Sequence, residues 1–258
     1  MKNYHTHTYR CKHAIGDVAD YAQEAVKQGI TVLGMSDHTP LPDDRWPSVR
    51  MHLSELEGYV AAIDSAQKKF LGIKVLKGME CEFAPEYVNF YQEILLDKYS
   101  FDYLIGAPHF VPGIEGWKNS YGGVKSPRDL RAYSNYMIDT MRSGLFAFIA
   151  HPDLFGNSYL EWDENTIACS RDIFSAAEEL HIPLEINGYG LRKPKIDTPN
   201  GQRRMYPLLP FWELARDYDI QVIVNSDAHK PKDVAANMGE AIQIAESNDL
   251  LVTELGYL

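Results

Sequence analysis

Several features that mark particular classes of protein are scarce or missing in this chain of 258 residues. No apolar run approaches the roughly 18 residues that span a bilayer, and the first residues, MKNYHTH, lack the apolar stretch of a signal peptide. The chain has only three cysteines, Cys11, Cys81 and Cys169, and none belongs to a Cys-x-x-Cys pair. These absences argue against a membrane protein, a disulfide framework and a cysteine zinc knuckle, and we expect a cytoplasmic protein.

A surplus of basic charge is also missing. The sequence has 25 Lys and Arg against 36 Asp and Glu, which gives a formal net charge of −11. Proteins that bind nucleic acids usually carry a basic surface, so no nucleic-acid partner is expected. A small anionic substrate remains compatible with this charge if metal ions supply positive charge locally.

Glycine-rich nucleotide motifs are absent after the first predicted strand, whereas short β-branched runs alternate with longer amphipathic segments along the whole chain. The predicted strands cover residues 2–7, 31–37, 74–81, 102–109, 146–152, 183–188 and 221–227. The predicted helices include residues 18–29, 53–70, 164–180 and 233–247. This alternation favours parallel βαβ units in one domain over residues 1–258, arranged as a barrel or an open sheet. Two long stretches, 110–127 and 188–207, are predicted as irregular loops with a functional role.

Most histidines follow the predicted strands. Seven of the nine lie at or just beyond a strand's carboxyl end, where two carboxylates also lie; the set is His5, His7, His13, His38, Glu80, His109, His151, Asp227 and His229. In an α/β barrel these ends share one face, so the side chains should converge there. His181 precedes a strand at the opposite end and is predicted to be structural, and the role of His52 is left open.

The types of these residues indicate a metal centre. On an extended strand, residues i and i+2 project to the same side, so His5 and His7 can bind one ion. A set rich in imidazole suits Zn²⁺, Mn²⁺ or Fe²⁺ better than Ca²⁺ or Mg²⁺. Nine ligands exceed the needs of one tetrahedral ion, so two or three divalent ions are expected. Asp37, directly before His38, is predicted to accept a hydrogen bond from a ligand imidazole.

In their order along the chain, these motifs resemble the polymerase and histidinol phosphatase (PHP) family. The resemblance rests on HTH (5–7), His13, SDH (36–38), GMECE (78–82), GAPH (106–109), AHPD (150–153) and NSDAH (225–229). It implies a single-domain, distorted (β/α)₇ barrel of the TIM type with metal ions at the carboxyl ends of the strands. It also implies one ion on His5, His7, Glu80 and Asp227, a second on His13, His38 and His229, and a third on Glu80, His109 and His151.

Within that family, the length of the chain and its two insertions resemble the monofunctional histidinol-phosphate phosphatases. The resemblance implies a metal-dependent phosphoric monoester hydrolase that converts L-histidinol phosphate to L-histidinol and phosphate in histidine biosynthesis. The mechanistic hypothesis is in-line attack on phosphorus by a metal-bridging hydroxide, without a phosphoenzyme. Glu80, Asp227 and His229 are the predicted catalytic residues, and either Asp227 or a water would protonate the leaving alkoxide.

The insertions supply the candidates for substrate binding. Arginine pairs with phosphate oxygens through its planar guanidinium group, which makes Arg192, Arg203 and Arg204 candidates for phosphate contact. A head group with an ammonium and an imidazole could meet acidic and aromatic side chains. The candidates for this role are Glu115, Trp117 and Tyr121, whereas Asn187, at the end of the sixth predicted strand, is a candidate either for substrate contact or for capping the loop that follows.

Three other readings stay open. The chain could be a PHP phosphoesterase that acts on another small ester, a nucleotide or an oligonucleotide. It could be a hydrolase of another metal-bearing barrel class, such as an amidohydrolase, although no lysine ends a mid-barrel strand. It could also be a metal-storing or regulatory module without turnover. The sequence leaves the oligomeric state open.

Overall fold

The computed structural model describes residues 1–113 and 116–256, which form two compact units. The first unit contains residues 1–105, residues 225–238 and Gly256, and the second contains residues 106–224 and 239–255. The interpretation of residues 1–258 as one domain stays a prediction.

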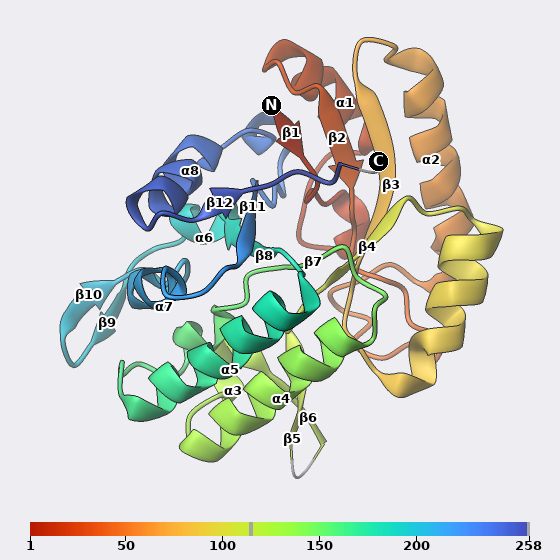
Figure 1. The fold of residues 1–258 in the computed structure, drawn as a ribbon. Helices are drawn as coiled ribbons and strands as arrows, with labels where there is room; N and C mark the ends of the chain where they lie inside the picture. Colours follow the sequence, from red (N-terminus) through yellow and green to blue (C-terminus); the bar gives the residue numbers. More distant parts are fainter. Residues whose placement is uncertain (114–115, 257–258) are drawn as a thin grey trace. The chain divides into compact units, whose positions relative to one another are not determined.

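The first unit holds parallel strands and helices in alternation (Figure 1). Its strands and α-helices are β1 (Lys2–Asn3), α1 (Val18–Lys27), β2 (Val32–Met35), α2 (Leu56–Lys69), β3 (Lys74–Cys81) and β4 (Tyr103–Gly106), of which Gly106 already belongs to the second unit. The shorter helical turns are η1 (Tyr9–Cys11), η2 (Leu53–Glu55), η3 (Pro85–Tyr87), η6 (Pro231–Asp233) and the π-helix η4 (Phe90–Lys98). The strand order is β1-β2-β3-β4, with β1 and β3 both parallel to β2. Helix α1 packs on β2 and helix α2 on β3.

The interior of this unit is shaped by glycines on β2 and β3. The Tyr103 ring of β4 reaches across both strands and donates its hydroxyl to the carbonyl oxygen of Tyr4 at 2.5 Å. A Cβ atom at Gly34 would lie 1.9 Å from Tyr103 Oη, and one at Gly78 would lie 2.4 Å from Tyr103 Cζ. Both strands therefore need glycine because an aromatic ring occupies the space of a side chain.

The second unit also alternates strands with helices and adds two hairpins. Its main strands and helices are α4 (Pro127–Arg142), β7 (Phe148–Ile149), α5 (Glu164–Leu180), β8 (Leu184–Asn187), α7 (Leu209–Ala215), β11 (Gln221–Asn225), α8 (Met238–Ser247) and β12 (Leu251–Val252), with Asn225 and Met238 lying in the first unit. The shorter elements are β5 (Phe110–Gly113), β6 (Gly116–Asn119), α3 (Ser120–Gly123), η5 (Leu154–Asn157), α6 (Gly188–Arg192), β9 (Ile196–Thr198) and β10 (Gly201–Arg203). Strands β7-β8-β11-β12 follow in that order, and the pairs β7–β8 and β11–β12 are parallel.

Helix caps and apolar faces explain the long helices of the second unit. Ser126 and Asp129 form a capping box before α4, with Pro127 at the first helical position. Asp163 and Thr166 form another at the start of α5. Helix α4 packs along α5 (Figure 1), and α5 also packs on α7, where the Phe174 and Phe211 rings lie 4.4 Å apart.

The prediction that residues 110–127 and 188–207 are irregular was wrong. The first stretch contains the antiparallel hairpin β5–β6 and the second contains the hairpin β9–β10. Pro199 and Asn200 form the turn of the second hairpin, and Gly201, the first residue of β10, has a φ of 101°, which glycine adopts without strain. Asn-Gly between extended segments is a hairpin signal, but the polar strands around it have no apolar alternation to reveal them. Predicted strand 2–7 also proved too long, since β1 ends at Asn3.

Among residues 1–113 and 116–256, no helix combines the length and apolar character that a membrane crossing requires.

The close approach of Tyr103 to Gly34 leads to a stability prediction. We expect Gly34→Ala to lower the free energy of unfolding by about 1–3 kcal/mol, because the new methyl group overpacks the interior. Urea unfolding followed by circular dichroism measures this change. The control is Gly58→Ala within α2, where an added Cβ meets no atom within 4 Å. This substitution should raise the free energy of unfolding by about 0.5–1 kcal/mol, because alanine favours the helix more than glycine does. Equal effects of the two substitutions would contradict the role given to Tyr103.

Candidate metal centre

His5 and His7, which follow β1, lie beside the segment that follows β11. Thr6 and Ala228 form a parallel bridge, and the His7 amide donates to the Ala228 carbonyl at 2.9 Å. The buried Asn3 side chain fixes this pairing, because it donates to Ser226 Oγ at 2.7 Å and to the Val234 carbonyl at 2.8 Å. The HTH and SDAH motifs, more than 200 positions apart in the sequence, therefore lie next to each other.

Glu80 at the end of β3 faces three imidazoles. Its Oε1 lies 3.3 Å from His5 Nε2, and its Oε2 lies 3.4 Å from His7 Nε2 and 2.9 Å from His38 Nδ1. A parallel bridge between His38 and Glu80 sets the last of these contacts. The two oxygens of this carboxylate therefore lie within reach of three candidate metal ligands, His5, His7 and His38.

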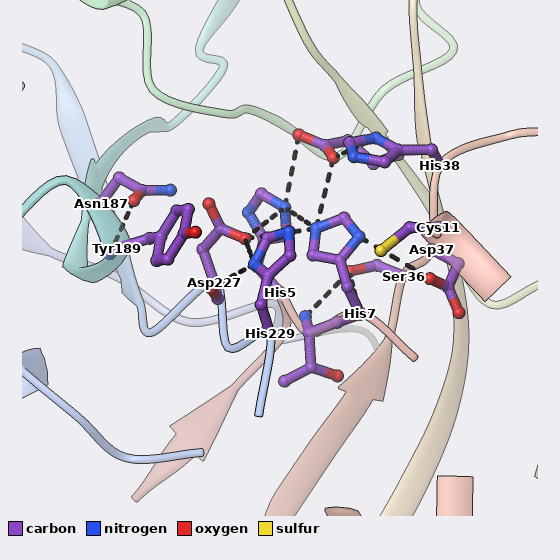
Figure 2. A network of polar contacts seen from close by, with 12 residues as sticks. His5, His7, Cys11, Ser36, Asp37, His38, Asn187, Tyr189, Asp227 and His229 are labelled. Atoms are coloured by element: carbon purple, nitrogen blue, oxygen red, sulfur yellow. Dashed lines mark hydrogen bonds and ion pairs between the residues drawn. The ribbon is translucent and has the colours of Figure 1, made fainter. Parts of the chain in front are cut away.

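Asp227 faces two of these imidazoles, those of His5 and His7, and also that of His229 (Figure 2). Its Oδ1 lies 3.2 Å from His7 Nε2, 3.7 Å from His5 Nε2 and 3.4 Å from His229 Nδ1. Its φ of 48° is unusual for a residue with a side chain. Strained backbone of this kind is typical of functional sites, where the surrounding structure enforces it.

His13, His38 and His229 form a second group of rings. The His13 ring centroid lies 5.3 Å from that of His38 and 4.8 Å from that of His229. His13 Nδ1 donates to the Cys11 carbonyl at 2.7 Å, because a carbonyl oxygen can only accept. That bond fixes the tautomer in which Nε2 is the metal-binding nitrogen.

The donor set fits divalent metal ions. His5 Nε2 and His7 Nε2 lie 3.1 Å apart, and both rings are buried. Two nitrogens that coordinate the same ion, each at about 2.0–2.1 Å, lie about 3 Å apart. The spacing of the two imidazoles therefore suits one shared metal ion. The ligand atoms of His7, His38 and His229, and those of His5, His7 and Glu80, lie within 4.8 Å of one another.

The charges in this site follow from burial and from the neighbouring side chains. Burial and the nearby His7 lower the pKa of His229 well below its usual value, which favours the neutral imidazole that binds metals. Burial by itself would raise the pKa of Asp227, but His5, His229 and His7 hold it well below its usual range. Burial raises the pKa of Asp37 to about 6, against the opposing effects of His7 and of hydrogen bonds from Thr8.

Asp37 lies beside His7. Its Oδ1 lies 3.8 Å from His7 Nδ1, and its carboxylate accepts the Thr8 amide and, at 2.6 Å, the Thr8 hydroxyl. Asp37 thus fixes the backbone directly after His7, and its predicted support of a ligand imidazole stays a prediction. Sequence reasoning missed Thr8, although its place directly after the HTH motif could have suggested it.

Cys11, which was not among the predicted site residues, also lies in this site. Its sulfur lies within 4.8 Å of ligand atoms of His13 and His229. Burial raises the pKa of the thiol, which disfavours the thiolate that metal ions bind. The sequence signal was its position two residues before His13.

Two further predicted ligands, His109 and His151, belong to the second unit. Their ring centroids lie 4.8 Å apart, and both side chains are buried. His151 has a φ of 30°, and its amide donates to Glu185 Oε2 at 3.1 Å. Their predicted place on a third ion with Glu80 stays a prediction.

The three candidate arginines are engaged with the protein itself. Arg203 donates to the carbonyls of Gly156, Tyr159, Arg204 and Met205, so phosphate binding would require it to leave these partners. Arg204 bonds the Leu191 carbonyl at 2.5 Å and pairs with Glu240 at 2.9 Å. Arg192 donates to the Gly188 carbonyl and stacks on the Tyr189 ring.

The other substrate candidates have diverse surroundings. Asn187 is buried, accepts the amides of Tyr189 and Gly190, and donates to Glu185, so it caps α6. The Tyr121 ring lies parallel to that of His109 at 6.2 Å. Trp117 packs edge-on against Tyr136 at 6.0 Å, and Glu115 lies outside the described residues.

The remaining two histidines lie elsewhere. His52 is exposed, and its Nδ1 lies 3.0 Å from Asp44 Oδ1. His181 ends α5 in the left-handed conformation, with a φ of 53°.

Several known proteins are similar to this chain in sequence. The family model described as "PHP domain" matches residues 3–188. A protein from Deinococcus radiodurans named "Probable histidinol-phosphatase" is 32% identical over 93% of this chain and 90% of its own length. A Schizosaccharomyces pombe protein with the same name is 28% identical over 90% of this chain and 82% of its own length.

A solved structure shows the same fold. The histidinol phosphate phosphatase of Lactococcus lactis, crystallised with zinc, L-histidinol and phosphate, superimposes with a TM-score of 0.73. The match covers 97% of this chain and 94% of the other at 16% identity. The predicted fold class, a barrel-like arrangement of parallel strands and helices, is confirmed.

The donor set leads to a prediction about metal content. We expect His7→Ala to lower the metal bound per chain by at least one ion, because His7 lies next to Glu80, Asp227 and His229. Elemental analysis after dialysis measures this number. The exposed His52 provides the matched control His52→Ala, which should keep the content of the parent protein. Unchanged metal in His7→Ala would contradict the assigned site.

Proposed function

We propose that this chain, which belongs to the PHP domain family, hydrolyses L-histidinol phosphate to L-histidinol and phosphate. The observation that carries the proposal is the buried cluster of imidazoles and carboxylates around Glu80 and Asp227. The names of the two relatives and the ligands of the Lactococcus lactis structure support the choice of substrate. Such an activity would belong to histidine biosynthesis.

The proposed cofactors are two or three divalent ions, Zn²⁺, Mn²⁺ or Fe²⁺. His5, His7, Glu80 and Asp227 would hold the first ion, and His13, His38 and His229 the second. His109 and His151 are the proposed ligands of a third. When bound, such ions lower the pKa of water and neutralise the charge of the phosphoryl group.

The protein's own side chains have a positioning role in this reaction. Thr8 and Asp37 fix the backbone after His7, and the Cys11 carbonyl fixes the His13 tautomer. Burial of Glu80 and Asp227 excludes bulk water from their carboxylates, which strengthens their electrostatic interactions. The leaving alkoxide needs a proton, for which Asp227 and a water molecule are the two candidates.

Substrate preference tests the proposal directly. Phosphate release should be measured on metal-loaded protein with L-histidinol phosphate, 5′-nucleotides and 4-nitrophenyl phosphate. We expect kcat/KM for L-histidinol phosphate to exceed the others by about 100-fold or more, because a matched head group adds binding energy. Slow and equal hydrolysis of all esters would support a phosphatase activity but contradict L-histidinol phosphate as its substrate. No hydrolysis of any ester would favour a metal-binding module.

The course of the reaction can be tested with labelled solvent. Direct attack by water on phosphorus places one solvent ¹⁸O atom in each phosphate released during a single turnover. Mass spectrometry of the phosphate, together with acid quenching of the protein, measures this outcome. A trapped phosphoryl-protein would overturn direct attack.

A further inference from the structure

The two strand ends that carry His38 and Glu80 are tied together within the first unit. The Glu80 amide donates to the Asp37 carbonyl at 3.0 Å, and the Thr39 amide donates to the Glu80 carbonyl at 2.9 Å. The Thr39 hydroxyl adds a second bond to the same carbonyl at 2.8 Å. Because these bonds lie on both sides of His38, they place its ring against the Glu80 carboxylate, with 2.9 Å between His38 Nδ1 and Glu80 Oε2.

Arg50 joins the same two strand ends a second time. Its Nη1 donates to the Thr39 carbonyl at 2.7 Å, and its Nη2 lies 3.0 Å from Glu82 Oε2. Thr39 directly follows His38, and Glu82 lies two residues after Glu80. One guanidinium group therefore contacts the chain just beyond each of these two predicted ligands.

The Arg50 side chain is closed off from solvent. Arg50 and Glu82 are only 2% and 1% exposed. The guanidinium lies 5.2 Å from the centroid of the Trp46 ring, and the Tyr91 hydroxyl fixes the Glu82 backbone by donating to its carbonyl at 2.6 Å. The buried guanidinium therefore acts on groups of the protein, and we assign it no contact with the substrate.

A buried pair of this kind is better suited to fixing geometry than to adding stability. Removing two opposite charges from water costs free energy that their attraction repays only in part, so such pairs add little net stability in many proteins. The planar guanidinium, however, donates in fixed directions, and Arg50 reaches Thr39 and Glu82 at the same time. A compact ammonium has no comparable fork.

We propose that Arg50 is a positioning residue of the metal centre, because it holds His38 and Glu80 at the separation at which both can bind metal ions. The inference deepens the proposed function and rests on its metal site, but not on the identity of the ester. Thr39 and Glu82 are the groups through which Arg50 acts on the two ligands.

The test is the substitution Arg50→Met, which removes the guanidinium and keeps an unbranched side chain. Binding of Zn²⁺ to the metal-free protein is measured by competition with a chromophoric chelator. We expect the dissociation constant of at least one Zn²⁺ ion to rise about 10- to 100-fold, because groups that orient metal ligands have effects of this size. The visible absorption bands of the Co²⁺-loaded protein should also change, because they report the geometry of the ligands.

Matched variants separate positioning from stability. Arg45 lies in the same loop and pairs with Asp43 at 2.9 Å and Glu86 at 3.4 Å, so Arg45→Met should keep the parent affinity for Zn²⁺. Ile63 is buried in α2, and Ile63→Ala should lower the midpoint of urea unfolding without weakening Zn²⁺ binding. Arg50→Lys keeps the positive charge without the planar fork, so its dissociation constant should lie between those of the parent and Arg50→Met.

Two outcomes would overturn the positioning role. The first is the parent Zn²⁺ affinity together with an unchanged Co²⁺ spectrum in Arg50→Met. The second is an equal loss of affinity in Ile63→Ala, because metal binding would then follow the stability of the fold. If Arg50→Met does not fold, Arg50→Lys decides in its place, and the parent affinity in that variant would contradict the proposal.

These measurements also keep the inference separate from the proposed function. They need no ester, since they record metal binding alone. A parent protein that binds Zn²⁺ but hydrolyses no ester would contradict the phosphatase function and leave the role of Arg50 intact.

Discussion

The pairing of the chain after β1 with the segment after β11 is the contact on which the first unit's site depends. Asn3 ties the two segments together through Ser226 and Val234, and the His7 amide bonds the Ala228 carbonyl. Both donors are buried, so loss of either bond would leave a polar group without water and cost about 1–3 kcal/mol. Without this pairing, His5 and His7 would have no reason to meet Asp227 and His229. The metal centre is in this sense a consequence of one side chain at the start of the chain and one stretch of backbone.

Such a cluster of buried polar groups lowers the stability of the folded protein. Imidazoles and carboxylates are crowded together with little exposure, and Asp227 and His151 adopt positive φ values, each at a cost of about 1–3 kcal/mol. Mutual attraction between Asp227 and its histidines offsets part of this cost, as the lowered pKa of Asp227 reflects. Divalent ions would offset more of it, since they bind the folded cluster in preference to the dispersed ligands of the unfolded chain. We therefore regard the site's crowding as the physical sign of its function.

The second unit illustrates how tertiary contacts change the meaning of a residue type. Arg203 was a reasonable candidate for phosphate by its chemistry, yet it braces a loop through four backbone carbonyls. Asn187 was a candidate for substrate contact or for loop capping, and the structure shows that it caps α6. Lys193 attracted no attention in the sequence, because a lysine beside an arginine in a polar stretch looks like solvated surface. Only the folding of α6 against Tyr206 brings its ammonium near three rings, those of Tyr121, Tyr189 and Tyr206.

The sequence by itself determined the alternation of strands and helices, the parallel character of the strands and the residues that end them. These features depend on local periodicity and on residue types, so they can be read without coordinates. Tertiary structure decided the hairpins β5–β6 and β9–β10, the early end of β1, the contact of Asp37 with the chain after His7, and the ring contacts of Lys193. They depend on which segments come to lie together, and a single sequence carries little record of contacts between residues that are far apart along the chain. The nine candidate ligands could be named from the sequence because their imidazole and carboxylate groups all suit metal binding. The surroundings of Lys193 could not, because they consist of three rings from separate segments of the chain.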